Sequence, residues 1–322
     1  MNSIGDFSFR APGLDEAKQV LDLMIRCDIS EYGEPDSDLD DLLWDWKGID
    51  LDRDVWLVHT PQGELVGYAA VTPWRINLRF HFYVDPSQED NDLLKALLEH
   101  CEMRGKDLAR ERGGDDPIKA IIYISHTNQQ QTELLQRSGY QVVKHIFNMQ
   151  ADLAIEVKAA AWPQDITVRS IQPGKDDRQV YDLIQEAFAR PGRTPPTFAE
   201  WKDFMMRPET FKPDIWFLAE AGGRLVGACL CFEYADSGVG WVSKLGVLAE
   251  WRRRGLGAGL LLHSFAEFKR RGFAKAALAV ESDNPNAISF YQGVGMEQIR
   301  FIDEYQGEIR LAADRKNRST KS

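Results

Sequence analysis

The residues best suited to do chemistry in this 322-residue sequence lie between positions 242 and 258. A short apolar segment there is followed by a loop and by apolar residues at helical spacing, which predicts a strand, a glycine loop and a helix. The loop and first helical turn contain Arg252, Arg253, Arg254, Gly255, Leu256, Gly257 and Ala258. Glycines let the backbone approach a ligand closely, and the first helical turn presents N–H groups at the positive end of the helix dipole. The pattern therefore predicts a phosphate site.

A second candidate group follows an expected strand over residues 275–280. Asn284 suits a helix N-cap, with Pro285 at the first helical position. A spacing of seven residues places Asn284 and Tyr291 on one helix face. A phenol of pKa about 10 can protonate a departing thiolate of pKa about 8.5, so Tyr291 suits a general acid. The alternatives are that Asn284 only caps the helix and that Tyr291 only packs.

These two segments resemble the two sequence motifs of the GNAT acyltransferases. Arg252, Gly255 and Gly257 match the spacing of the coenzyme A pyrophosphate motif of that family in full. Asn284 and Tyr291 match the positions of its second motif. The resemblance implies acetyl-CoA as the cosubstrate, bound by residues of the glycine loop and by Asn284, with Tyr291 beside the cofactor sulfur.

The same resemblance implies roles for the strand before the loop. In the family this strand splays from its neighbour, so that its free backbone groups bind the pantetheine arm as an added strand would. By position, Val247 holds the pantetheine and the N–H of Leu245 faces the acyl carbonyl. Negative charge grows on that oxygen as the amine attacks, and a preplaced N–H stabilises it.

The general base of the family is missing from its usual position. Many members have a glutamate eleven residues before the first arginine of the loop, where this sequence has Trp241. Tryptophan cannot accept a proton, so Glu233, Glu281 or a water chain must take the proton of the amine. A structural role is the alternative for either glutamate. Because no residue is an obvious covalent relay, we expect direct attack of the amine in a ternary complex.

The sequence contains an internal duplication. A strand, a polar turn and a Leu-Val-Gly run occur near residues 54–67 and again near 214–227. Opening strands are expected near residues 7–10 and 166–169, at nearly the same offset. A third landmark, late in each half, is an Asn followed by a Leu or a Tyr and then by a Gly, and it also recurs at nearly this offset. Three landmarks in one order indicate a repeat.

The first copy lacks the determinants of phosphate binding. An alignment of Val84 with Val247 puts Glu89, Asp92 and Leu94 where the second copy has its arginine and its two glycines. Carboxylates repel pyrophosphate, and side chains at these positions block close approach of the backbone. We therefore expect one CoA per chain, bound by the second copy.

The sequence thus predicts an α/β protein with two tandem GNAT folds, each a mixed, mostly antiparallel twisted sheet flanked by helices. We expect a degenerate domain over 1–157, a catalytic domain over 165–313 and a polar tail over 314–322. This architecture resembles that of mycothiol synthase and its relatives.

Composition excludes several classes of partner and cofactor. The net charge of -11 opposes adsorption on nucleic acid or anionic lipid. No apolar run reaches the roughly 18 residues that span a bilayer, and the N-terminus lacks a secretory signal, so we expect a cytoplasmic protein. We also expect a monomer or a weak dimer. Four cysteines without CxxC spacing or a Cys and His cluster predict reduced structural thiols and no metal.

The predicted reaction is transfer of an acetyl group from acetyl-CoA to a primary amine on a small-molecule or aminoacyl acceptor. The alternative is a non-catalytic acyl-CoA sensor, which the missing base favours and Tyr291 opposes. We expect a neutral or cationic acceptor between the two halves, near an acidic segment that in GNAT folds borders the acceptor site; a solvated loop is the alternative. That segment contains Glu31, Glu34, Asp36, Asp38, Asp40 and Asp41.

Overall fold

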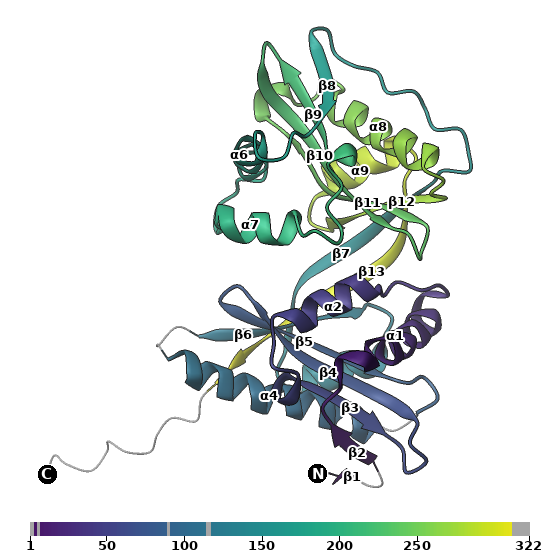
Figure 1. The fold of residues 1–322 in the computed structure, drawn as a ribbon, viewed down its shortest axis with the longest axis vertical. Helices are drawn as coiled ribbons and strands as arrows, with labels where there is room; N and C mark the ends of the chain where they lie inside the picture. The colour runs from purple at the N-terminus through teal and green to yellow at the C-terminus, as the bar shows by residue number, and fades with distance from the viewer. Residues whose placement is uncertain (1–2, 5–6, 89–90, 114–116, 311–322) are drawn as a thin grey trace, which may run out of the picture. The chain divides into compact units, whose positions relative to one another are not determined.

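The structure, a computed structural model, describes residues 3–4, 7–88, 91–113 and 117–310. The chain forms two compact units (Figure 1). The first unit contains residues 1–146 and the end of the chain from Phe301, and the second contains residues 147–300. The expected polar tail over 314–322 lies outside the described residues.

The first unit has a mixed sheet in the order β1-β2-β3-β4-β5-β6-β13. Its strands are β1 (Ser3–Ile4), β2 (Phe7–Arg10), β3 (Val55–His59), β4 (Leu65–Trp74), β5 (Asn77–Val84), β6 (Ile118–Ser125) and β13 (Glu297–Ile309). Its helices are η1 (Leu14–Glu16), α1 (Ala17–Tyr32), α2 (Leu39–Lys47), α3 (Leu51–Asp54), α4 (Asn91–Arg112) and α5 (Gln129–Arg137). Only β5 and β6 among these neighbours run parallel in the described part of the unit.

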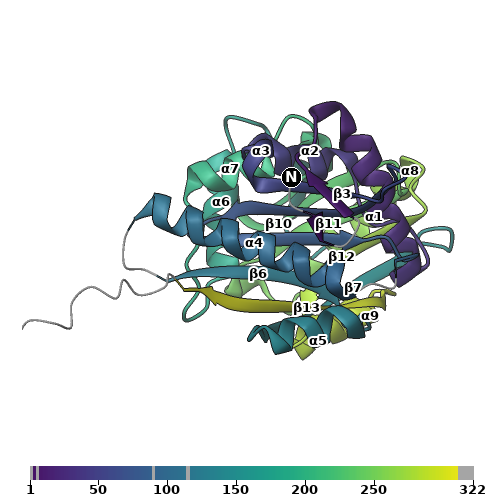
Figure 2. The same ribbon diagram turned by 90° about the horizontal axis from the view of Figure 1, so that it is seen from below.

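The two faces of this sheet are covered by different helices because side chains alternate along each strand. Tyr68 and Ala70 of β4 pack with residues of α1 and α2. Ala69 and Val71 of the same strand pack with residues of α4. Figure 2 shows α4 lying across the strands and β13 beside β6.

The second unit repeats this order of elements. Its sheet has the order β8-β9-β10-β11-β12-β7, and β11 and β12 are parallel. The strands are β7 (Gln141–Asp152), of which the part from Phe147 belongs to this unit, β8 (Ile166–Ser170), β9 (Phe217–Ala221), β10 (Arg224–Tyr234), β11 (Val239–Val247) and β12 (Lys275–Glu281). The helices are α6 (Asp177–Ala187), α7 (Phe198–Met205), η2 (Pro213–Ile215), η3 (Ala249–Trp251), α8 (Leu256–Arg270) and α9 (Pro285–Gly293). The predicted α/β fold with mixed sheets and flanking helices is confirmed.

The final strands of the two repeats are exchanged, so the units differ from the contiguous halves 1–157 and 165–313 expected from the sequence. β13 ends the second repeat, yet Ile302–Ile309 pair antiparallel with β6 of the first unit. Tyr305 is 1% exposed in the core of the first unit, whereas Met149 of β7 is buried in the core of the second. Packing of these side chains, rather than order along the chain, decides which sheet each strand joins.

In each unit the parallel strand pair opens after a short contact. β11 pairs with β12 only from Val239 to Trp241 among the described residues, although its pairing with β10 continues to Val247. β5 pairs with β6 only at Leu78 and Arg79, although its pairing with β4 continues to Val84. Each opening leaves one strand edge whose backbone groups have no strand partner in the described part of the chain, and a ligand can bind to such an edge.

No helix within the described ranges is long and apolar enough to cross a membrane.

Candidate active site

The opening between β11 and β12 begins immediately after Trp241. Leu245 and Val247 lie on the free edge of β11, opposite Cys229 and Gly227 of β10. The register shifts next to Leu230, so that Ser243 is an extra residue on β11. Such a bulge bends a strand and interrupts its ladder, and bulges recur next to active sites. The edge around Leu245 can therefore bind an extended chain through backbone hydrogen bonds.

This free edge leads into the glycine loop and the start of α8. Gly255 is the N-cap residue of α8, and its φ of +85° is a left-handed conformation that favours glycine. No side chain among the described residues caps the helix, so the N–H groups of its first turn are available to an anion. Gly257 differs from Gly255, because its backbone conformation does not favour glycine. A Cβ there would meet Phe290 at 3.6 Å and Val247 at 3.8 Å, which are ordinary contacts, so packing within the chain does not require this glycine.

The three arginines of the loop have different surroundings. Arg252 donates from Nε to the Val247 carbonyl at 3.0 Å and from Nη2 to the Ala187 carbonyl at 2.8 Å. It therefore fixes the end of β11 against the end of α6. Arg254 lies 5.0 Å from the centre of the Trp251 ring, a cation–π contact. Arg253 is exposed and has a positive φ of 58°.

The second predicted motif also has a structural component. Asn284 Oδ1 accepts the N–H of Ala287 at 3.1 Å, which caps α9 as the sequence allowed. Tyr291 is half-buried, and burial, followed by the nearby Cys229, raises its pKa to about 12. Cys229 is the register partner of Leu245, so the phenol and the Leu245 backbone lie in the same part of the unit. A phenol with this pKa keeps its proton at neutral pH, although it is a weaker acid than a free phenol.

The two glutamates considered as bases are both held in ion pairs. The side chain of Glu233 is 6% exposed, and its two oxygens lie 2.6 Å from Lys212 Nζ and 2.9 Å from Arg271 Nη1. Along β10 it is also roughly 13 Å from Cys229 at the usual strand rise. Glu281 receives two bonds from Arg190, at 2.6 and 3.0 Å. Glu233 therefore lies far along β10 from Cys229, and cationic side chains hold both carboxylates.

Sequence reasoning missed Lys244, which directly precedes Leu245. A Cβ at Gly246 would lie 2.9 Å from Ile184 of α6, so Gly246 faces that helix, and Lys244, two residues earlier, lies on the same face of β11. Burial, and secondarily the charge of Arg193, lowers the pKa of Lys244. The signal that could have identified Lys244 is that it is the single charged residue in an expected strand segment.

One group of side chains with metal-binding spacing occurs among the described residues, in the first unit. The ligand atoms of His126, His145 and Asp303 lie within 4.8 Å of one another. Asp303 is buried, and its two oxygens lie 2.9 Å from His126 Nδ1 and 2.6 Å from His145 Nδ1. These side chains already satisfy one another by hydrogen bonds, and none belongs to the unit that contains the glycine loop.

The corresponding segment of the first unit has no glycine loop in its described part. Glu89 lies outside the described residues, and Leu94 is buried in α4 within the core. Asp85, directly after β5, pairs with Arg26 at 2.7 Å and accepts hydrogen bonds from Ser87. An anionic carboxylate therefore occupies the region where the second unit begins its phosphate-binding pattern.

Comparison with known proteins identifies the family. Residues 178–296 match the Acetyltransferase (GNAT) family. A solved GCN5-related N-acetyltransferase from Sphaerobacter thermophilus is 31% identical, with a TM-score of 0.84 over 97% of this chain and 99% of that one. A tandem GNAT protein from the clavulanic acid biosynthesis pathway, 17% identical, has the same fold, with a TM-score of 0.72 over 95% of this chain and 99% of its own.

Curated relatives are named mycothiol acetyltransferases. The mycothiol acetyltransferase of Streptomyces avermitilis is 31% identical over 64% of this chain and 70% of its own length. That of Streptomyces bingchenggensis is 27% identical over 74% of this chain and 76% of its own. The chain belongs to the GCN5-related N-acetyltransferase family. It is a two-domain GNAT N-acetyltransferase, and enzymes of this class use acetyl-CoA as cosubstrate.

Proposed function

We propose that the second unit transfers the acetyl group of acetyl-CoA to a primary amine of a small-molecule acceptor. The observation that carries this proposal is the continuity of the free β11 edge with the uncapped start of α8. An extended pantetheine arm fits the first, and a pyrophosphate fits the second. The described part of the first unit has the strand edge without the glycine loop.

The cofactor contacts follow from this geometry. The N–H groups of Leu256, Gly257 and Ala258 bind the pyrophosphate, and the charges of Arg253 and Arg254 attract it. Two donors of Arg252 hold the loop in place, and its remaining N–H groups can contact the pyrophosphate, as the family motif implies. The Asn284 amide nitrogen remains available to the cofactor while its oxygen caps α9.

The reaction then requires three proton transfers. The acceptor nitrogen forms a bond with the acetyl carbon, and the N–H of Leu245 stabilises the oxyanion. The carbon–sulfur bond breaks as Tyr291 gives its proton to the thiolate, and the acylated nitrogen then returns a proton to the tyrosinate, which leaves a neutral amide. The acceptor ammonium must first lose a proton, and Glu233 is committed to its ion pairs. Lys244 directly precedes Leu245 on β11, and burial lowers its pKa, so it is the side chain that we assign to accept that proton, directly or through water.

A screen of acetyl-CoA consumption tests this function. The panel contains primary amines, aminoacyl conjugates and mycothiol-related amines, because curated relatives are named for mycothiol. We expect a stoichiometric acetylated product with at least one of these amines, and loss of that product in a Gly257→Asp variant. The alternative is a non-catalytic acyl-CoA sensor, which the missing glutamate at Trp241 favours. Saturable acetyl-CoA binding without any acetylated product across the panel would establish that alternative.

A further inference from the structure

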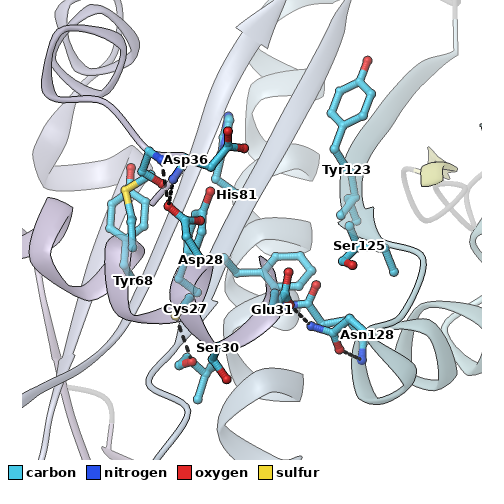
Figure 3. A pocket seen from close by; sticks show the side chains of 18 of the residues that line it. Cys27, Asp28, Ser30, Glu31, Asp36, Tyr68, His81, Tyr123, Ser125 and Asn128 are labelled. Atoms are coloured by element: carbon cyan, nitrogen blue, oxygen red, sulfur yellow. Dashed lines mark hydrogen bonds between the residues drawn. The ribbon is translucent and has the colours of Figure 1, made fainter. Parts of the chain in front are cut away.

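The first unit contains a cavity of about 620 Å³ in the opening between β5 and β6 (Figure 3). Its walls come from α1, α2 and the segment between them, from the splayed parts of β5 and β6, and from the start of α5. It thus occupies the position that, in the second unit, lies between β11 and β12. The duplication has kept the opening in the first unit, although the glycine loop is missing from its described part.

The charge of the cavity wall is strongly negative. Arg79 and His81 are its basic side chains among the described residues. The carboxylates that line it are those of Asp28, Glu31, Asp36, Asp38, Asp41, Asp45 and Asp85. Of the acidic segment singled out in the sequence, Glu31, Asp36, Asp38 and Asp41 therefore form part of a cavity wall rather than a freely solvated loop.

Asp28 is the carboxylate that is most firmly fixed in this wall. Its residue is 5% exposed, and its Oδ2 accepts the N–H groups of Asp36 at 2.9 Å and Ser37 at 2.7 Å. No cationic side chain pairs with it in the described part of the chain. Burial therefore raises the pKa of Asp28, and burial also raises the pKa of Glu31, which accepts a hydrogen bond from Asn128. A buried carboxylate in this state gains stability from a cation.

Aromatic and apolar groups complete the wall. Tyr68, Tyr83 and Tyr123 line the cavity, and Tyr68 accepts a hydrogen bond from Trp46 Nε1 at 3.0 Å. Figure 3 shows Asp28 bonded to the backbone at Asp36, and Glu31 beside Asn128. Tyrosine rings attract cations through their faces and pack against apolar bodies. The combination of a preformed cavity, buried acid and aromatic wall suits a ligand that has an amine on an apolar body.

We propose that this cavity is a separate binding site of the first unit for an organic amine. The ammonium group binds next to Asp28 and Glu31, and the apolar body packs against the tyrosines. The same wall disfavours acetyl-CoA, because phosphates entering along β5 would meet Asp85. The site goes beyond the transfer reaction proposed above, since none of its residues belongs to the second unit.

Calorimetry on the full chain tests the site with three amines, tyramine, benzylamine and spermidine. 4-Ethylphenol and benzyl alcohol are uncharged counterparts of the first two. The key variant is Asp28→Asn, whose amide oxygen can still accept the two N–H groups and so keep the local fold. We expect it to weaken binding of the tightest amine about tenfold or more, as for loss of a charge-assisted hydrogen bond. Asp22→Asn is the matched control, because Asp22 is exposed on the same helix outside the cavity.

The outcomes separate the alternatives. Preference for amines over their uncharged counterparts, lost in Asp28→Asn and kept in Asp22→Asn, supports the site. Amine binding that ignores Asp28 belongs to the acceptor site of the second unit and overturns the proposal, as does absence of binding by all three amines at millimolar concentration. A second molecule of acetyl-CoA per chain, lost in Asp28→Asn, would instead assign the cavity to a CoA ligand. A thermal melt of each variant shows that it remains folded.

Discussion

Gly257 allows a defect in cofactor binding to be separated from a defect in folding. A Cβ at this position makes only ordinary contacts, 3.6 Å to Phe290 and 3.8 Å to Val247, and its backbone is not left-handed. Replacing a helical glycine with alanine stabilises by up to about 1 kcal/mol, so Gly257→Ala should melt no lower than the wild type. Gly255 cannot serve this purpose, because its positive φ adds a strain of roughly 1–2 kcal/mol for any other residue.

The binding effect follows from the position of Gly257 in the first turn of α8. A methyl group there projects among the N–H groups assigned to the pyrophosphate, and an aspartate adds a like charge. Two unit charges 4 Å apart repel by about 4 kcal/mol at an effective dielectric of 20, and exposure to solvent and salt reduces this value. A remaining penalty of about 1.5–3 kcal/mol corresponds to a 10- to 100-fold weaker Kd for acetyl-CoA in Gly257→Asp.

Calorimetry with acetyl-CoA and thermal denaturation measure the two effects on the same samples. Gly293→Ala and Gly293→Asp are matched controls, because Gly293 lies at the far end of α9 with nothing within 4 Å of an added Cβ. We expect both controls to bind one acetyl-CoA with unchanged Kd. An unchanged Kd in Gly257→Asp, with a normal melt, would refute the placement of the pyrophosphate at α8.

Four further substitutions test other parts of the account. Tyr291→Phe should lower kcat roughly 10- to 1000-fold with little change in the Kd for acetyl-CoA, as expected for loss of a general acid; an unchanged kcat would leave Tyr291 a packing residue only. Lys244→Met should lower kcat/KM and remove the acidic limb of its pH profile, whereas a merely structural lysine would leave the shape of that profile unchanged. Glu267 has a pKa lowered to about 2, first by its hydrogen bond with Arg270, so its stabilising contribution is present above its ordinary pKa of 4.5 and is lost as the pH falls toward 2. The difference in melting temperature between wild type and Glu267→Gln should accordingly shrink over that range, and a constant difference would contradict the ion pairing. Tyr305→Ala should lower the free energy of unfolding of the first unit by about 3–5 kcal/mol in urea titrations, although residue 305 lies near the end of the chain; a change confined to the second unit would contradict the strand exchange.

Local chemistry made several features predictable from the sequence. Gly255 is left-handed at the start of α8, and Asn284 caps α9, because a tight turn and a helix cap depend on a few consecutive residues. The recurrence of strand, turn and helix signals predicted two copies of one fold, and the repeated order of elements in the two units agrees with it. The match to the GNAT motifs predicted the family, which the solved and curated relatives confirm.

Other features depend on side chains that are far apart in the sequence. Arg252 matches a cofactor motif, but its guanidinium bonds the Ala187 carbonyl of a helix 65 positions earlier. Glu233 had the right chemistry for a base, and only the fold pairs it with Lys212 and Arg271. Lys244 gains its lowered pKa from burial, which no spacing rule predicted.

The sequence by itself determined the repeated fold, the glycine loop and the set of residues that we propose to bind acetyl-CoA, because each is encoded in short segments whose backbone geometry follows from local residue types. The tertiary structure alone decided the exchange of β7 and β13, since Met149 and Tyr305 are buried in the cores opposite to those of their repeats. It also decided that the acids of α1 and α2 surround a cavity in the first unit. Packing of faces and burial of charge are properties of residues brought together by folding, and a linear pattern does not contain them.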